Sequence, residues 1–399
     1  MAPGSTRVPG APAAGSSFRQ NAETYALKAR ANQRCRDDFL CELRGLCARQ
    51  SGVKSACVTE YRELETRILA ALREEWDVAE GDALWLEVFA FQTRWNEPYA
   101  KFCATRPAPR AWREIPAVPL AAFKTARLSV MPPELVTKTF LTSGTTGETR
   151  GAHHFPGTRL YERAVNYGWA RLGRRSRDQF ALVAGTTDAP HSSLSHMISS
   201  LTALTTSTLF FVGQDGRLKT DRLLESLEDR IRHGRAVALP GTALAFLRFF
   251  EELGTRRLAL PKGSYALETG GFKGSGRELP KAELYAMFGE YLGLAPDDVI
   301  NEYGMTELSS QFYTRGLVGV HEGPPWARAV VIDPETGDDA AVGETGVLRI
   351  FDLANLGSVL AVETQDLAVR RERGFELIGR DPAALPRGCS RAADERMRG

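Results

Sequence analysis

Hydroxyls, glycines and one cation are concentrated in the eleven residues from Leu141 to Gly151. Glycine tolerates backbone turns that other residues disfavour, so several N–H groups can converge on one point. The Thr and Ser hydroxyls add donors, and Arg150 adds a guanidinium that can form two parallel hydrogen bonds. Together these groups suit the oxygens of a phosphate. An ordinary surface turn is the alternative for such a loop when it is taken alone.

A second loop, from Glu268 to Gly274, follows a predicted strand. Open α/β sheets bind ligands at the carboxyl ends of their strands. Gly270 and Gly271 would let a flat ligand lie close to the backbone there. A plain connection between a strand and a helix is the alternative.

The segment from Asn301 to Glu307 also follows a predicted strand, and it combines an aromatic ring, a hydroxyl and a carboxylate. Tyr303 supplies the ring, Thr306 the hydroxyl and Glu307 the carboxylate. Mg²⁺ prefers oxygen ligands and usually binds together with substrate phosphates. Glu307 is therefore the candidate metal ligand.

Two charged residues farther along the chain complete the set of candidates. Asp366 lies in the segment from Glu363 to Leu367, and its carboxylate could accept hydrogen bonds from a diol. Arg380 follows Gly379 and could neutralise a phosphate.

The elements that would position these loops follow from the apolar pattern. Between residues 179 and 301 short apolar runs alternate with helical segments, which indicates βαβ units and a largely parallel sheet. The strands are expected at Phe180–Ala184, Thr208–Val212, Ala236–Leu239, Tyr265–Glu268 and Asp298–Asn301. The helices are expected at Asp221–His233, Thr242–Glu252 and Lys281–Leu292. Thr220 or Asp221 would cap the first helix, and Gly234 would end it.

After Pro325 the pattern changes to short β-like runs separated by turn signals, which predicts an antiparallel or barrel-like subdomain. The runs are Ala329–Ile332, Gly346–Phe351, Val359–Glu363 and Phe375–Ile378. Near the start of the chain, apolar residues at a spacing close to 3.6 predict a helix at Glu60–Arg73.

The predicted fold class is therefore α/β, and we expect five regions along the chain. They are a disordered leader at 1–17, a helical part at 18–105, an α/β core at 106–325, a β-rich subdomain at 326–380 and a tail at 381–399 that carries Cys389.

Composition argues against several classes of protein. The formal net charge of +2 is too small to indicate binding to nucleic acid or to an anionic membrane. No apolar run approaches the ~20 residues of a spanning helix, and residues 1–17 lack the apolar stretch of a signal peptide, so we expect a cytoplasmic protein. None of the six cysteines forms a C-x-x-C pair, and no histidine has the spacing of a zinc ligand.

In their order along the chain, these stretches resemble the adenylate-forming superfamily of acyl-CoA synthetases, peptide-synthetase adenylation domains and firefly-type luciferases. The family's motifs T-S-G-T-T-G-x-P-K-G, Y-G-x-T-E, T-G-D and G-R are matched, in that order, at Thr142–Gly147 with Gly151, Tyr303–Glu307, Thr364–Asp366 and Gly379–Arg380. The resemblance implies the large N-terminal domain of these enzymes, with mostly parallel sheets flanked by helices and a barrel-like β subdomain. Three positions depart from the pattern, and at one of them Gln365 stands where T-G-D has its glycine. The loop lysine is Arg150 here, which keeps the charge, and the loop proline is Thr149.

The resemblance also implies a role for each matched residue, with ATP and Mg²⁺ as the cofactors. The residues that hold the β- and γ-phosphates would be Thr142, Ser143, Gly144, Thr145, Thr146, Gly147 and Arg150. Those that border the adenine would be Gly270, Gly271 and Tyr303. Asp366 would bind the ribose hydroxyls, and Thr306 would touch the α-phosphate. Glu307 would hold Mg²⁺, and Arg380 would contact the ribose or the α-phosphate.

More narrowly, Thr269–Lys273, Pro190–Met197 and Arg387–Ser390 resemble the LuxE-type acyl-protein synthetases. Those enzymes activate a fatty acid and then carry it as a thioester on a cysteine near the C-terminus, so the resemblance implies this role for Cys389. The acyl-site candidates are His191, His196, Phe272 and Lys273. The implied partner is a reductase that accepts the acyl group.

Larger members of the superfamily continue past the G-R motif into a domain of roughly a hundred residues. Only 19 residues follow Arg380, so we expect that domain to be absent here. One alternative keeps the adenylate but uses CoA, an amine or a carrier protein as the acyl acceptor. Another is a non-catalytic nucleotide-binding protein, which the intact Glu307 and Asp366 argue against. A serine hydrolase is disfavoured because no G-x-S-x-G motif occurs.

Overall fold

The computed structural model describes residues 52–73, 78–142, 149–173, 177–201, 207–270, 279–317 and 319–380. The chain falls into two units, Met1–Val58 and Thr59–Gly399. Helix α2 (Gly52–Ala71) begins in the first unit and ends in the second, and it confirms the helix predicted at 60–73. All other elements described below belong to the second unit.

Two further helices, α3 (Val78–Trp95) and α4 (Glu97–Cys103), meet at Asn96. The Asn96 side chain accepts a hydrogen bond from the Tyr99 N–H (3.3 Å), which is the geometry of a helix N-cap. Short helical turns follow at η1 (Trp112–Glu114), α5 (Ala122–Thr125) and η2 (Pro133–Leu135). Among the described residues, no helix is both long enough and apolar enough to cross a membrane.

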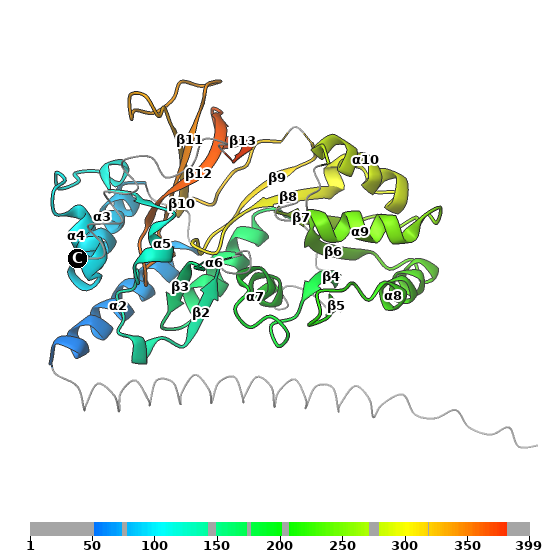
Figure 1. Ribbon diagram of the computed structural model, residues 1–399, viewed down its shortest axis with the longest axis horizontal. Coiled ribbons are helices and arrows are strands. Elements are labelled where there is room, and N and C mark those ends of the chain that lie inside the picture. The colour runs from blue at the N-terminus through cyan, green and yellow to red at the C-terminus, as the bar shows by residue number, and fades with distance from the viewer. Residues whose placement is uncertain are drawn as a thin grey trace, which may run out of the picture. The chain divides into compact units, whose positions relative to one another are not determined.

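The central sheet has six strands in the order β5-β4-β6-β7-β8-β9 (Figure 1). All neighbours are parallel except β9, which runs antiparallel to β8. The strands are β4 (Asp178–Ala184), β5 (Thr208–Val212), β6 (Val237–Thr242), β7 (Tyr265–Thr269), β8 (Val299–Tyr303) and β9 (Phe312–Arg315). The first five match the five strands predicted from the sequence to within a few residues, and the parallel arrangement is confirmed.

Side chains of the central strands alternate between two apolar cores, because successive residues of a strand point to opposite faces. On β4, Phe180 and Leu182 enter one core, and Ala181 and Val183 enter the other. The first core is covered by α8 (Thr220–Arg232), α9 (Ala243–Leu253) and α10 (Lys281–Leu292) (Figure 1). The second is covered by α6 (Arg159–Ala170), α7 (Ser193–Ser200) and the hairpin of β2 (Lys138–Leu141) and β3 (Ala152–Phe155). The predicted α/β fold class is confirmed as a layered α/β/α arrangement.

A second sheet contains β10 (Ala327–Ile332), β11 (Thr345–Asp352), β12 (Ala361–Arg370) and β13 (Phe375–Arg380), all paired antiparallel. These strands confirm the β-rich pattern expected after Pro325. The short strand β1 (Val118–Pro119) pairs parallel with β12. A segment that lies before the central sheet in the sequence therefore belongs to the second sheet, whose other strands lie after the central sheet.

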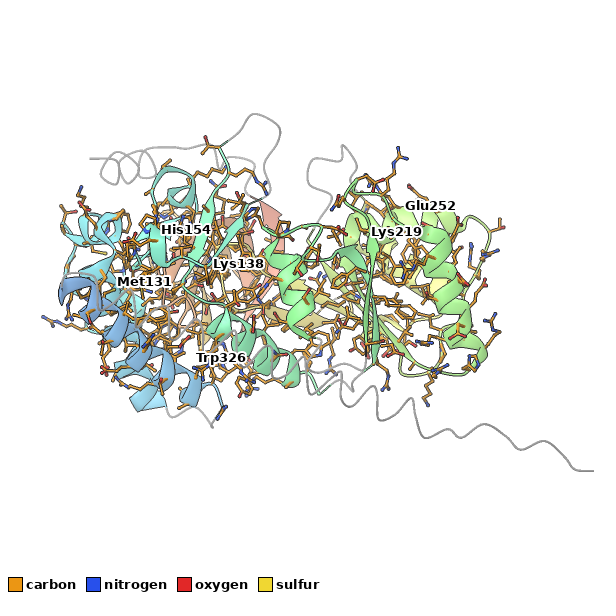
Figure 2. The ribbon with its side chains drawn as sticks, turned by 90° about the horizontal axis from the view of Figure 1, so that it is seen from below. Met131, Lys138, His154, Lys219, Glu252 and Trp326 are labelled. Atoms are coloured by element: carbon orange, nitrogen blue, oxygen red, sulfur yellow. The ribbon has the colours of Figure 1, made fainter. Side chains whose placement is uncertain are left out.

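The strands β2 (Lys138–Leu141) and β3 (Ala152–Phe155) pair antiparallel and flank the hydroxyl- and glycine-rich loop in the sequence. Figure 2 labels one residue from each strand, Lys138 and His154. His154 lies opposite Thr139, and its Nδ1 is 3.0 Å from the Thr139 hydroxyl. This cross-strand contact adds to the ladder that fixes where the loop begins and ends.

Candidate active site

The base of the loop is closed by a pair of hydrogen bonds between its two ends. The Thr142 N–H donates to the Gly151 carbonyl (2.9 Å), and the Gly151 N–H donates to the Thr142 hydroxyl (2.8 Å). Arg150 Nε donates to the Thr142 carbonyl (2.6 Å). The predicted phosphate-holding residues from Ser143 to Gly147 lie outside the described residues, so the structure fixes the ends of this loop.

Two predicted site residues from different sheets meet directly. The Tyr303 hydroxyl, at the carboxyl end of β8, donates to Asp366 Oδ2 on β12 (2.9 Å). Arg380 on β13 is the ladder partner of Asp366. The Tyr303 ring is buried and packs edge-on against Phe375 (centroids 5.2 Å apart). Burial is the main cause that raises the pKa of Tyr303, so the phenol keeps its proton and acts as the donor.

Thr306 and Glu307 are held by three separate elements. The Thr306 carbonyl accepts from His153 Nδ1 on β3 (2.9 Å), and its hydroxyl lies 3.2 Å from the Ser193 hydroxyl at the start of α7. The Glu307 carbonyl accepts from Asn355 Nδ2, which lies after β11 (2.8 Å). The Glu307 side chain is itself buried. The backbone of the Thr306–Glu307 segment is therefore bonded to β3 and to the residues after β11, and the Thr306 hydroxyl lies beside the start of α7.

A buried carboxylate supports the turn just after Glu307. Asp352, at the end of β11, accepts from the N–H groups of Ser309 (2.8 Å), Ser310 (2.7 Å) and Ala354 (3.0 Å), and from the Ser310 hydroxyl (2.8 Å). Burial raises the pKa of Asp352, and these donors oppose that rise because they stabilise the charged form. Asp352 is not among the residues predicted from the sequence, although an aspartate at the end of an apolar β-like run is a usable signal.

The helical part of the chain also contributes to this support, although its sequence contains no motif. Gln92 on α3 is buried; its Nε2 donates to the Asn355 carbonyl (2.9 Å), and its Oε1 accepts from the Leu360 N–H (3.0 Å). Asn96 Nδ2 donates to the Ser358 carbonyl (3.1 Å). The β11–β12 connection, which holds Glu307, thus has its own backbone groups satisfied by α3 and the residue that follows it.

Two buried carboxyl groups lie at the carboxyl ends of β7 and β8. Glu268 Oε2 accepts from Asn301 Nδ2 (2.5 Å), and Glu302 Oε2 accepts from the Thr269 hydroxyl. Burial raises the pKa of each to about 7, and the charge of Glu268 contributes to the rise at Glu302. Both acids would therefore be partly protonated near neutral pH, and Glu302 directly precedes Tyr303 in the chain.

This burial predicts a pH-dependent stability effect of Glu302→Gln. An exposed glutamate in the unfolded chain titrates near 4.3, so between about pH 4.5 and 7 the folded state holds a proton that the unfolded state has released. Stability from this group is therefore lost as the pH rises through that window. The amide cannot ionise, so the variant should melt a few degrees above the wild type at pH 8 and level with it at pH 4.5. Calorimetry at both pH values measures this, and a difference that does not depend on pH would contradict it.

Two glycines of the later loops, Gly270 and Gly304, occupy positions where the local geometry favours glycine. Gly270 adopts φ +73°, the left-handed region that favours glycine. A Cβ at Gly304 would overlap Glu302 Oε1, so a side chain at this position would displace the carboxyl from where it lies. Gly271, Phe272 and Lys273 lie outside the described residues.

The two histidine candidates for the acyl site make local contacts. His191 is exposed; its carbonyl accepts from the Leu141 N–H (3.0 Å), and its Nδ1 lies 3.0 Å from the Thr139 carbonyl. It therefore borders the open edge of β2. The His196 ring packs against Phe140 and Tyr161, with centroids 5.2 and 5.5 Å away. Their proposed roles toward an acyl group remain predictions, as does that of Cys389, which lies outside the described residues.

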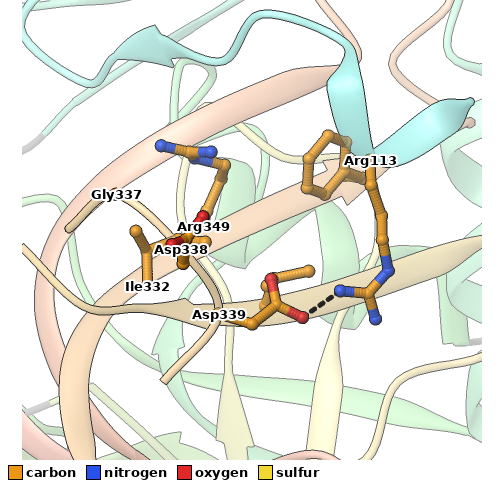
Figure 3. Close-up of a pocket in the computed structure, with 8 residues that line it drawn as sticks. Arg113, Ile332, Gly337, Asp338, Asp339 and Arg349 are labelled. Atoms are coloured by element: carbon orange, nitrogen blue, oxygen red, sulfur yellow. Dashed lines mark hydrogen bonds and ion pairs between the residues drawn. The ribbon is translucent and has the colours of Figure 1, made fainter. Parts of the chain in front are cut away.

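Two hollows in the described surface contain none of the predicted site residues. One, of about 130 Å³, lies between β10 and β11, where Arg113 forms an ion pair with Asp339 (Figure 3). The other, of about 610 Å³, lies at the start of α8 and includes Lys219 and Glu252 (Figure 2). The candidate site is therefore defined by convergent side chains rather than by either hollow.

Comparisons with known proteins found similar sequences and a similar fold. The chain is 24% identical over 340 residues to the long-chain-fatty-acid–luciferin-component ligase of Aliivibrio fischeri, covering 79% of this chain and 88% of that protein. It is 23% identical over 364 residues to the ligase of the same name from Vibrio harveyi, covering 85% and 95%. A crystal structure of an open conformation of 2-hydroxyisobutyryl-CoA ligase with 2-HIB-AMP and CoA aligns with a TM-score of 0.58 over 79% of each chain, at 16% identity. That likeness shows a shared fold. No protein-family model matches the sequence.

Proposed function

We propose, on the premise that this chain belongs to the adenylate-forming superfamily on the branch of the long-chain-fatty-acid–luciferin-component ligases, that it activates a carboxylic acid with ATP. The observation that carries the proposal is the hydrogen bond between Tyr303 and Asp366. It joins the Y-G-x-T-E and T-G-D motifs across two sheets, at the carboxyl end of a central strand, where α/β sheets bind nucleotides.

In the first step a carboxylate oxygen of the acid attacks the α-phosphorus of ATP, a new P–O bond forms, and pyrophosphate leaves. Such a reaction needs positioning and charge neutralisation more than covalent help from the protein. The loop closed by Thr142 and Gly151 would hold the β- and γ-phosphates, with Arg150 at its end. Thr306 would contact the α-phosphate, and Asp366 would accept from the ribose hydroxyls beside Arg380.

The residues around Glu307 fit a magnesium ion held jointly with phosphates. No group of three or more His, Cys, Asp or Glu side chains within the described ranges could hold a metal alone. Mg²⁺ commonly binds with one or two carboxylates plus substrate oxygens, and Glu307 with the neighbouring Thr306 hydroxyl offers oxygen donors only. When bound, Mg²⁺ would neutralise charge that develops on the departing pyrophosphate.

In the second step the Cys389 thiolate would attack the acyl carbonyl; a C–S bond forms, the bond to the phosphate oxygen breaks, and AMP leaves. Cys389 follows Arg380 by nine positions, and nine extended residues span up to about 30 Å. Since Arg380 is the ladder partner of Asp366, the thiol is tethered within reach of a nucleotide bound at Asp366. The acyl group would then pass to a partner protein such as a reductase.

The substrate class we propose is a medium- or long-chain fatty acid, because both sequence relatives are named for long-chain fatty acids. A screen of pyrophosphate release across fatty and aryl acids tests this. The expected result is ATP-dependent release with fatty acids and none with aryl acids. Release of AMP that requires added CoA would instead favour a CoA ligase, and an absence of release with every acid would favour a non-catalytic nucleotide-binding protein.

A further inference from the structure

We infer that His153 is a positioning residue that fixes the Thr306–Glu307 segment relative to Thr142 and Gly151, the paired ends of the predicted phosphate-holding loop. The inference rests on the proposed function and deepens it, since it names the group that couples two parts of the same site. The contact that carries it is the hydrogen bond from His153 Nδ1 to the Thr306 carbonyl (2.9 Å).

His153 lies on β3, close to the paired ends of the loop. It lies two positions after Gly151, whose N–H and carbonyl close the loop on Thr142. It is opposite Phe140 in the β2–β3 ladder. A shift of β3 would therefore move the loop base and the His153 ring together, and the bond to Thr306 would transmit that shift to the carboxylate segment.

The protonation of the ring follows from the contact. A carbonyl oxygen only accepts, so Nδ1 must carry the proton when it bonds to Thr306. His153 is 1% exposed, and burial lowers its pKa to about 4. It is accordingly a neutral donor at physiological pH. This bond links segments that are 153 residues apart in sequence, which no local motif could reveal.

Packing and hydrogen bonding by this residue can be separated experimentally. The ring lies against Phe155 (centroids 4.1 Å apart) and edge-on to Phe123 (5.7 Å). His153→Phe keeps an aromatic ring among these neighbours and removes the donor. His153→Asn removes the ring and keeps an N–H near the position of Nδ1. A packing role and a positioning role therefore predict opposite orders for the two variants.

The test measures pyrophosphate release with saturating acid and Mg²⁺·ATP, together with melting temperatures. A positioning role predicts that His153→Phe lowers kcat by about 10- to 100-fold, the scale of a misplaced reacting group. It predicts that His153→Asn keeps kcat within about threefold of the wild type, although it melts at a lower temperature because packing is lost. Activity and stability would then follow opposite orders.

A second readout does not depend on turnover. ATP raises the melting temperature of a protein that binds it, and Mg²⁺ should add a further increment if Glu307 is correctly placed. That increment should be kept in His153→Asn and reduced in His153→Phe. If no acid supports pyrophosphate release by the wild type, the proposed function fails. The Mg²⁺ increment in melting temperature still tests whether His153 positions Glu307.

Two results would overturn the inference. One is a His153→Phe variant with wild-type kcat and an undiminished Mg²⁺ increment; the other is activity that falls in step with melting temperature in both variants. If His153→Phe does not fold, His153→Asn decides alone: kcat kept at a lowered melting temperature supports positioning, and a large fall in kcat contradicts it.

Discussion

Glu307→Gln should lower the rate of acyl-adenylate formation by about 100- to 1000-fold, the usual effect of removing one preorganised charge from an active site. Glutamine has nearly the shape of glutamate, so the substitution removes the charge and leaves the packing in place. The backbone at this position is bonded to Asn355 Nδ2 (2.8 Å), and the following turn is anchored on Asp352. The loss should therefore arise from chemistry and not from unfolding.

Pyrophosphate release at saturating ATP, Mg²⁺ and acid measures this effect. Glu335→Gln is the matched control, because Glu335 is exposed in the turn after β10 and the same change of charge there should leave the rate within about twofold. A Glu307→Gln variant with the wild-type rate and an unchanged melting temperature would show that Glu307 takes no part in the reaction.

Cys389→Ser should abolish the acyl group that the protein carries as a hydroxylamine-labile thioester, while pyrophosphate release in a single turnover stays near the wild-type level. The thiolate is the competent nucleophile of a cysteine side chain. A serine hydroxyl stays protonated without a base beside it and attacks far more slowly.

Cys103 provides a control for this experiment. It is partly buried, and burial raises the pKa of its thiol to about 12, so it remains protonated and a poor nucleophile. Cys103→Ser should retain the label in full after incubation with ATP and radiolabelled fatty acid. Label that persists on Cys389→Ser and is released by hydroxylamine would rule out the thioester role of Cys389.

The sequence predicted well those elements whose signals are local. The helix at 281–292 was predicted with the bounds that the structure has, because an apolar stripe and Gly293 at its end mark it. The prediction for the start of α8 was less accurate. Lys219 is the N-cap residue rather than Thr220 or Asp221, since the Thr220 hydroxyl bonds instead to Glu252 on α9. A tertiary contact thus overrode the local capping preference.

The motifs singled out Tyr303 and Asp366, whose side chains meet in the structure, and their roles toward a nucleotide remain predictions. The supporting residues could not be predicted in this way. Asn355 reaches the Glu307 carbonyl across 48 positions, and Gln92 reaches the Asn355 carbonyl across 263. Such pairs depend on how whole elements pack, and each partner alone is an ordinary polar residue in an apolar stretch. Buried amides and carboxylates need partners, but sequence does not say where those partners lie.

The central claim is that the acid's own oxygen becomes bonded to the α-phosphorus of ATP. The most direct measurement uses a fatty acid labelled with ¹⁸O in its carboxylate, followed by mass spectrometry of the nucleotide products. Because the thiol or hydroxylamine attacks the acyl carbon, our account predicts AMP that carries one ¹⁸O atom, and unlabelled pyrophosphate. Formation of ADP with ¹⁸O in inorganic phosphate, or AMP without label, would contradict the acyl-adenylate.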